Sequence, residues 1–293
     1  MPSLDSTLQA LLDGLMLGGV YALMTSGLAL TFGVMRVANF AQGDFVTLGM
    51  YVAYMLWTFF GVDPYLGAIV VAALIMVAGI LVELGLLERL PQAAHQPQFI
   101  LTLGLSVLIE NIIQGVAGAT PFSVNTSYSN SYAHVGSSIV FQTPEIYAAI
   151  TAVIALVALQ VFLQRTRFGR SLRATTDDPM AAEAVGVSIR TTRAIAFGIG
   201  TGLAGLAGCA LSTFQLIQPT NGQSFLFLMF VAVLIGGVGS LLGATIGALI
   251  VGLVQALAVL VIPLQLDNGV IYLLLLVILF IRPFGLFGVR ARV

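Results

Sequence analysis

The chain has 293 residues, of which 59% are hydrophobic and 8% are charged, and its formal net charge is -1. Soluble domains have about 25% charged residues, so this composition excludes a soluble fold and indicates a helical protein that crosses a membrane many times. All eleven basic residues are arginines, and the absence of lysine excludes a P-loop and a lysine Schiff base. The single cysteine, Cys209, excludes an internal disulfide and a cysteine-cluster metal site. We therefore expect no enzyme activity, no cofactor and no metal.

Apolar runs separated by short polar breaks predict an all-α polytopic fold with eight or nine transmembrane helices in one domain, residues 1–293. The first run is expected to be retained as a span, because the segment before it has acidic residues where a signal peptide needs basic ones. The break near residue 239 is short, so residues 222–261 form either two spans or a re-entrant hairpin. The expected spans are 8–34, 40–60, 65–87, 99–119, 145–163, 194–214, 225–238, 241–261 and 270–281.

The arginines set the expected orientation, because positively charged loops stay on the cytoplasmic side. Residues 164–193 carry six of the eleven arginines and are expected in the cytoplasm, whereas residues 120–144 contain no basic residue and are expected outside. Threading the spans between these loops places the N-terminus outside and the C-terminus in the cytoplasm. Every arginine then falls on the cytoplasmic side.

The cytoplasmic loop contains the signals of a short helix. Asp178 is a capping residue, Pro179 occupies the first helical position, and Gly186 follows the last one. A helix of about eight residues is not stable alone in water, so it needs a surface to lie against. The residues alone leave two interpretations open: a surface helix at the lipid boundary, or a docking helix for a cytoplasmic partner.

A polar cluster directly follows the first span. Asn39, Gln42 and Asp44 form it, with Gly43 among them. Such a cluster fits a broken helix that lines a cavity, because irregular backbone at membrane depth needs polar surroundings. The alternative is a plain helix-to-helix turn with an Asn or Asp cap.

The fourth span contains Glu110 and Asn111 well inside its apolar run. An ionisable group at that depth is costly in lipid, so it is a candidate for a translocation pathway. The alternative is a protonated or hydrogen-bonded Glu110 that holds two helices together. Glu83 is nearer the cytoplasmic end of its span, and we interpret it as a structural residue that reaches the membrane interface.

Two breaks resemble each other. NFAQGDF (39–45) follows the first span, and PTNGQSF (219–225), which contains Asn221, follows the sixth. The first break is expected inside and the second outside, as in an inverted-topology repeat with the pathway between its halves. Asn221 therefore joins Asn39, Gln42, Asp44, Glu110 and Asn111 as a pathway candidate.

Nearly the whole chain resembles the LivH-type permease subunits of ATP-binding-cassette (ABC) importers for branched-chain amino acids. The resemblance rests on residues 14–51, 168–208, 234–249 and the tail IRPFGLFG (281–288). One position departs from the family pattern, which usually reads NFAHG, because Gln42 stands in place of the histidine. Related permeases carry urea, short-chain amides or other small carboxylates, and these remain alternative substrates.

The resemblance implies an ABC importer permease fold and a set of partners. These are a homologous second permease, two cytoplasmic ATP-binding subunits, an extracytoplasmic solute-binding protein and the lipid bilayer of a bacterial inner membrane, with no nucleic acid. Residues 164–193 then become the cytoplasmic coupling loop. The residues expected to engage the ATPase are Asp178, Pro179, Ala182, Glu183 and Gly186.

A rival function from another class also stays open. The chain is then a secondary transporter or channel that works alone, with Glu110 as a proton relay. Transport by the purified chain, driven by a gradient alone, distinguishes this rival from the importer.

Overall fold

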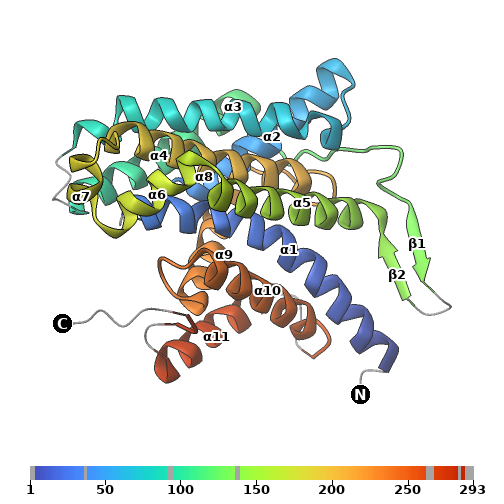
Figure 1. The fold of residues 1–293 in the computed structure, drawn as a ribbon. Helices are drawn as coiled ribbons and strands as arrows, with labels where there is room; N and C mark the ends of the chain where they lie inside the picture. Colours follow the sequence, from blue (N-terminus) through green and yellow to red (C-terminus); the bar gives the residue numbers. More distant parts are fainter. Residues whose placement is uncertain are drawn as a thin grey trace.

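A computed structural model describes residues 4–35, 38–90, 95–135, 139–261, 267–282 and 285–287. These residues form eleven α-helices, one short 3-10 helix and one β-hairpin (Figure 1). The α-helices are α1 (Leu4–Met35), α2 (Gln42–Phe60), α3 (Pro64–Gly85), α4 (His95–Ala117), α5 (Thr143–Arg165), α6 (Arg167–Asp177), α7 (Pro179–Ala184), α8 (Ile189–Leu211), α9 (Asn221–Gly236), α10 (Leu241–Ala258) and α11 (Asp267–Ile281). The 3-10 helix is η1 (Leu87–Arg89), and the strands are β1 (Tyr132–Val135) and β2 (Ile139–Gln142).

Each predicted span coincides with a helix, but the helices differ in how far they reach. In the described residues, six helices are long and apolar enough to cross a membrane: α1, α3, α4, α5, α8 and α10. Helix α9 has 16 residues, so it is about 24 Å long and shorter than a hydrocarbon core of about 30 Å. Residues 222–261 form two helices, α9 and α10, which are joined by a turn where Gly237 and Gly239 adopt φ angles of 102° and 88°.

Helix α2 begins in the interior of the bundle. Its first residue, Gln42, donates a hydrogen bond to the carbonyl of Gly200, which lies near the middle of the 23-residue α8. Gly200 is about 16 Å along α8 from its start at Ile189. The predicted second span is therefore a helix that starts level with the middle of α8.

Two elements were not predicted from the sequence. The expected loop 120–144 contains the β1–β2 hairpin, which pairs antiparallel with Tyr132 opposite Gln142, so the all-α prediction is wrong for this segment. The expected loop 164–193 contains α6, whose first turn is capped by the Thr166 hydroxyl accepting from Gly169 N–H. Residues 120–144 and 164–193 are polar and lack the long apolar runs from which the membrane spans were predicted.

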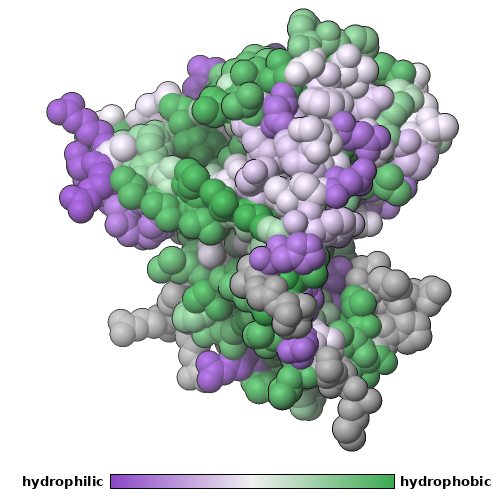
Figure 2. Space-filling model, turned by 90° about the vertical axis from the view of Figure 1, so that its right-hand side faces the viewer, coloured by the Kyte–Doolittle hydropathy of each residue, from purple (hydrophilic) through white to green (hydrophobic). Residues whose placement is uncertain are grey.

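The helix ends fall on two faces of the bundle. At one end, the Gln9 side chain of α1 bonds to the backbone of Val140 in β2, and the Tyr65 hydroxyl of α3 donates to the Pro144 carbonyl at the start of α5. At the other end, Glu88 after α3 pairs with Arg190 at the start of α8. Figure 1 shows the hairpin and α7 at opposite ends. Figure 2, which views the hairpin end, shows pale and purple residues over much of the upper half and green hydrophobic residues around them.

Helices α1 and α8 form the centre of the bundle. Helix α1 packs along α10, and α8 packs along α3, while α1 and α8 also cross each other. The helices approach each other closely where they cross, because glycine residues lie at the crossing points. A Cβ atom at Gly252 of α10 would lie 2.5 Å from the Gly18 Cα of α1, and one at Gly205 of α8 would lie 2.7 Å from the Ile75 side chain of α3. Small residues allow helices to pack this closely in lipid, where the hydrophobic effect does not drive helices together.

The α1–α10 crossing gives a stability prediction. Gly252→Ala places a methyl group against the Gly18 backbone, which cannot move aside as a flexible side chain can, and we expect a cost of about 1–3 kcal/mol. Thermal unfolding in detergent measures the effect as a lower midpoint. The control is Gly104→Ala in α4, where the added Cβ meets no atom within 4 Å, so its midpoint stays equal or rises. Equal midpoints for the two variants would contradict the packing described for α1 and α10.

Candidate functional site

The break between α1 and α2 is held by side-chain hydrogen bonds. The Asn39 carbonyl oxygen accepts from Ala41 N–H at 3.1 Å, and its amide donates to the Gln42 side-chain oxygen at 3.0 Å. The Gln42 amide in turn donates to the Gly200 carbonyl at 2.9 Å. Asn39 and Gln42 are both buried, with exposed fractions of 2% and 0%. The two predicted pathway residues therefore tie the start of α2 to the middle of α8.

Glycine makes room for this connection. A Cβ atom at Gly27 of α1 would collide with the Gly200 carbonyl and lie 3.0 Å from the Gln42 amide nitrogen. A Cβ atom at Gly43 would collide with the Gly222 carbonyl at the start of α9. The first turns of α2 and α9 therefore meet backbone to backbone in the interior.

Asp44 lies in the first turn of α2 and is fully buried. One carboxylate oxygen, Oδ1, approaches the position that a Cβ atom on Gly222 would take, and the other, Oδ2, has no hydrogen-bond partner within the described residues. The Ser106 side chain of α4 lies near the carboxyl group. A carboxylate at a helix N-terminus is stabilised by the helix dipole, which favours the placement of Asp44 here.

Helix α4 turns a polar stripe toward this carboxylate. Gln98, Thr102, Ser106 and Glu110 are spaced four residues apart and therefore share one face of the helix. The first three of these are buried, whereas other positions around the helix carry exposed apolar residues. The apolar ones are Ile100, Leu103 and Val107.

Glu110 connects this stripe to α9. Its Oε2 atom accepts a hydrogen bond of 2.8 Å from the Gln223 side chain, near the exposed end of the contact. Asn221 donates to the Leu216 carbonyl at 2.7 Å, so it closes the turn before α9. Asn111 is exposed and donates to the Val107 carbonyl of its own helix, so the structure separates it from the other candidates.

The resulting polar seam is formed by Asp44, Ser106, Glu110 and Gln223, between α2, α4 and α9. Sequence reasoning found Asp44 and Glu110 and missed the other two. The four-residue spacing on α4 was the signal for Ser106. No comparable signal marks Gln223, because it is the close approach of Gly43 and Gly222 that brings it near.

The short helix α7 is built by local capping. The Asp178 carboxylate accepts from the N–H groups of Met180 and Ala181 at 2.9 and 3.1 Å. The helix begins at Pro179 and ends at Ala184, and Gly186, two residues later, has a φ of 89° in the left-handed region. Val187 N–H closes the end on the Ala182 carbonyl at 3.0 Å.

The two sides of α7 differ. Ala182 is buried, with 3% of its surface exposed, so it faces the rest of the protein. Glu183 is exposed, and the apolar residues Met180 and Val185 are 81% and 79% exposed. Of the five predicted coupling residues, Asp178, Pro179 and Gly186 shape the helix, Ala182 seats it, and Glu183 lies on the free surface. Met180 and Val185 were not predicted.

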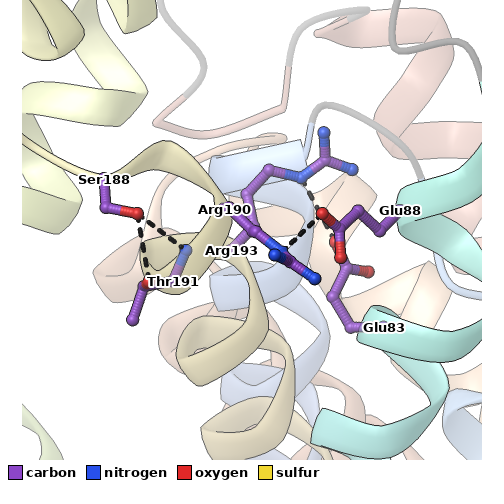
Figure 3. Close-up of polar contacts among 6 residues, drawn as sticks. All are labelled: Glu83, Glu88, Ser188, Arg190, Thr191 and Arg193. Carbon is purple, nitrogen blue, oxygen red and sulfur yellow. Dashed lines mark hydrogen bonds and ion pairs between the residues drawn. The ribbon is translucent and has the colours of Figure 1, made fainter.

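Four charged residues lie just behind α7 (Figure 3). At the surface, Arg190 pairs with Glu88, and in the interior Arg193 Nε lies 3.3 Å from Glu83 Oε1. Glu83 was expected to reach the membrane interface. The structure corrects this, because Glu83 is buried against α8 and meets the arginine there.

No group of three or more histidine, cysteine, aspartate or glutamate side chains lies close enough to hold a metal ion within the described residues.

The Gln42 hydrogen bonds predict which substitutions are tolerated. Gln42→Leu removes the side-chain hydrogen bond that the Gly200 carbonyl accepts in addition to its helical one, and it leaves the buried Asn39 amide without its acceptor, so we expect a cost of about 1–3 kcal/mol. Gln42→His keeps one donor for Gly200 and one acceptor for Asn39, so it serves as the matched control. Detergent-stability midpoints measure the difference. If both variants are equally stable, these hydrogen bonds do not hold the break.

Comparisons with known proteins agree on the family of this chain. Residues 10–279 match the family model described as "Branched-chain amino acid transport system / permease component". The chain is 28% identical to the high-affinity branched-chain amino acid permease LivH of Salmonella typhimurium, over 96% of this chain and 95% of that protein. It is 29% identical to a probable LivH of Methanocaldococcus jannaschii (91% and 88%) and 30% identical to the ribose import permease RbsC of Bacillus subtilis (83% and 72%). No solved structure matches the chain. The chain thus belongs to the family of permease components of branched-chain amino acid transport systems.

Proposed function

We propose that this chain forms half of the translocation pathway of an ABC importer for branched-chain amino acids and is driven through α7. The observation that carries the proposal is the surface of α7. Met180 and Val185 expose apolar side chains on a polar segment that carries most of the described arginines, at the end of the bundle opposite the hairpin. A small apolar patch with a charged rim is typical of a protein-binding surface. A helix lying in the lipid boundary is the alternative.

The partners follow from the family and from the absence of lysine. The chain is a permease component, and ATP hydrolysis belongs to separate subunits. We propose two ATP-binding subunits on the α7 face, a homologous second permease that completes the pathway, and a solute-binding protein at the hairpin face. The N-terminus is then outside a bacterial inner membrane and the C-terminus is in the cytoplasm.

The packing supports an inverted repeat. Helices α1 and α2 would correspond to α8 and α9, since each long central helix is followed by a break and a shorter helix that begins in the interior. Helix α1 packs along α10 as α8 packs along α3, and the first turns of α2 and α9 meet. In transporters with such repeats, substrate passes near the broken helices, where helix N-termini and polar side chains replace water.

The polar seam is the part of the chain that we propose contacts substrate. A branched-chain amino acid carries an ammonium group, a carboxylate and an apolar side chain. Asp44 and Glu110 match the ammonium group, and the positive dipole ends of α2 and α9 match the carboxylate. The seam opens at Gln223, which is exposed, and closes at Asp44, which is buried. This arrangement fits a closed state of the pathway.

The coupling mechanism follows from the chain path. When the ATP-binding subunits close on ATP, they displace α7, which is joined to α6 and α5 on one side and to α8 on the other. A displacement of α7 then tilts α5 and α8. The side of the membrane to which the polar seam opens changes as a result.

The substrate is proposed from the family match and from the near-complete coverage by LivH permeases. Urea and short-chain amides lack the ammonium group that the seam is proposed to bind. Competition of radiolabelled leucine uptake by isoleucine, urea and acetamide separates these substrates. If urea or acetamide competes with leucine and isoleucine does not, the substrate is assigned to urea or short-chain amides instead.

The exposed surface of α7 gives the first prediction for this function. Met180→Asp with Val185→Asp places two charges on the apolar surface, and we expect the ATP-binding subunits to be lost on co-purification and uptake to fall at least tenfold. Met180→Leu with Val185→Ile is the matched control, because it keeps the surface apolar. The docking role fails if the aspartate variant retains both the subunits and uptake.

Glu110 distinguishes the importer from the rival transporter. Glu110→Gln removes the charge and retains an acceptor for Gln223, so we expect ATP-dependent uptake to drop about tenfold, in line with the loss of one charged hydrogen bond of about 1.5 kcal/mol. Initial rates of uptake into proteoliposomes at several pH values measure this drop. Unchanged uptake assigns Glu110 to packing. Gradient-driven uptake by the chain alone, abolished in this variant, supports the rival.

A further inference from the structure

The start of α8 is bound to the end of α3 by charges that the proposed pathway does not use. Arg190 and Glu88 form the outer pair, with side-chain exposures of 68% and 29%. Arg193 and Glu83 form the inner pair, with exposures of 9% and 3%. Figure 3 shows both arginines reaching from the first turns of α8 toward the glutamates at the end of α3.

The inner pair is poorly explained by stability alone. Removing two charges from water is costly, and apolar residues of similar volume often stabilise such a position equally well. The contact also leaves Arg193 Nε and Nη2 and Glu83 Oε2 without a well-aligned hydrogen bond within the described residues. A cavity of about 30 Å³ adjoins the four side chains and has room for a bridging water. The pair therefore holds the two helices by charge while keeping some freedom to adjust.

The rest of the α3–α8 interface is closely packed. Cβ atoms at Gly198 and Gly205 would lie 2.5 and 2.7 Å from the Ile80 and Ile75 side chains, so these residues leave no space between the helices. The Thr201 hydroxyl also lies 3.3 Å from the Ile75 carbonyl as a donor. The ion pairs thus fasten the cytoplasmic end of an interface that is already interlocked along its length.

Because α8 follows α7 directly in the sequence, a movement of α7 reaches the start of α8 before the rest of that helix. After α7 ends, Ser188 caps α8 by accepting from Thr191 N–H at 3.4 Å, so only a few residues separate α7 from the first turn of α8. Arg190 and Arg193 lie in the first two turns of α8. A displacement of α7 must pass them before it reaches the membrane-embedded part of α8.

We propose that Glu83 and Arg193 are positioning residues that transmit the displacement of α7 to α3, so that α3 and α8 move as one body. This inference rests on the proposed function, in which α7 is the contact for the ATP-binding subunits. Its consequence is that two helices, one from each half of the chain, respond to ATP together. Without the pair, the ends of α3 and α8 nearest α7 separate more readily, and less of the displacement of α7 reaches α3.

The first test uses Glu83→Gln in the assembled importer, reconstituted into proteoliposomes. We expect the ATPase rate to stay within about twofold of the parent while leucine uptake falls, so that ATP consumed per leucine rises several-fold. The exchange Glu83→Arg with Arg193→Glu should restore much of the ratio. Glu88→Gln is the matched control, and its exposed pair should change the ratio less. An unchanged ratio in Glu83→Gln overturns the proposal.

A second test does not depend on how well these variants assemble. Glu88→Cys and Arg190→Cys, in a Cys209→Ala background, are joined by a short thiol cross-linker. Helices that move as one body should retain uptake after cross-linking, whereas a block that reductant reverses shows that α8 slides on α3 and overturns the proposal. Failure of the proposed function itself is recognised separately, because the ATP-binding subunits would then not co-purify with the unsubstituted chain.

Discussion

Backbone-to-backbone approach at glycine is the constraint on which the rest of the structure depends. In lipid, helices associate through close packing and hydrogen bonds, because lipid tails and apolar side chains are alike. Where Gly27 meets Gly200, the gap is narrow enough for the Gln42 amide to reach a main-chain carbonyl. Where Gly43 meets Gly222, the first turns of α2 and α9 come together, and the polar seam forms beside them. Larger side chains at these crossings would separate the groups that the pathway needs.

Charge and polarity are sorted along the bundle. At the α7 end, Arg190 and Arg193 meet Glu88 of η1 and Glu83 of α3, and Met180 and Val185 are exposed. In the interior, the side-chain amides of Asn39, Gln42 and Asn221 bond to backbone groups at the breaks before α2 and α9, and the Asp44 carboxylate is buried beside them. At the other end, the hairpin bonds to α1 through Gln9. A partner that acts on α7 is therefore far from the seam, and only rigid helix contacts can connect the two.

Composition and apolar runs were sufficient to predict nine helices, because a membrane span needs a long apolar run and leaves a clear signal. The same signal failed for α6, which is polar, and for the hairpin within residues 120–144. Hydropathy alone did not show where α2 begins, but the polar cluster of Asn39, Gln42 and Asp44 indicated a broken helix there as one of two interpretations. Asp178, Pro179 and Gly186 predicted α7 correctly, since capping is local in sequence. The pairing of Glu83 with Arg193 was missed, because their 110-residue separation is bridged only by tertiary packing.

The central claim is that the free surface of α7 faces the cytoplasm. Labelling of Met180→Cys, in a Cys209→Ala background, with a membrane-impermeant maleimide tests it most directly. The account predicts labelling in inverted membrane vesicles and protection there when the ATP-binding subunits are present. Labelling in right-side-out vesicles would contradict the orientation, the coupling contact and the import mechanism together.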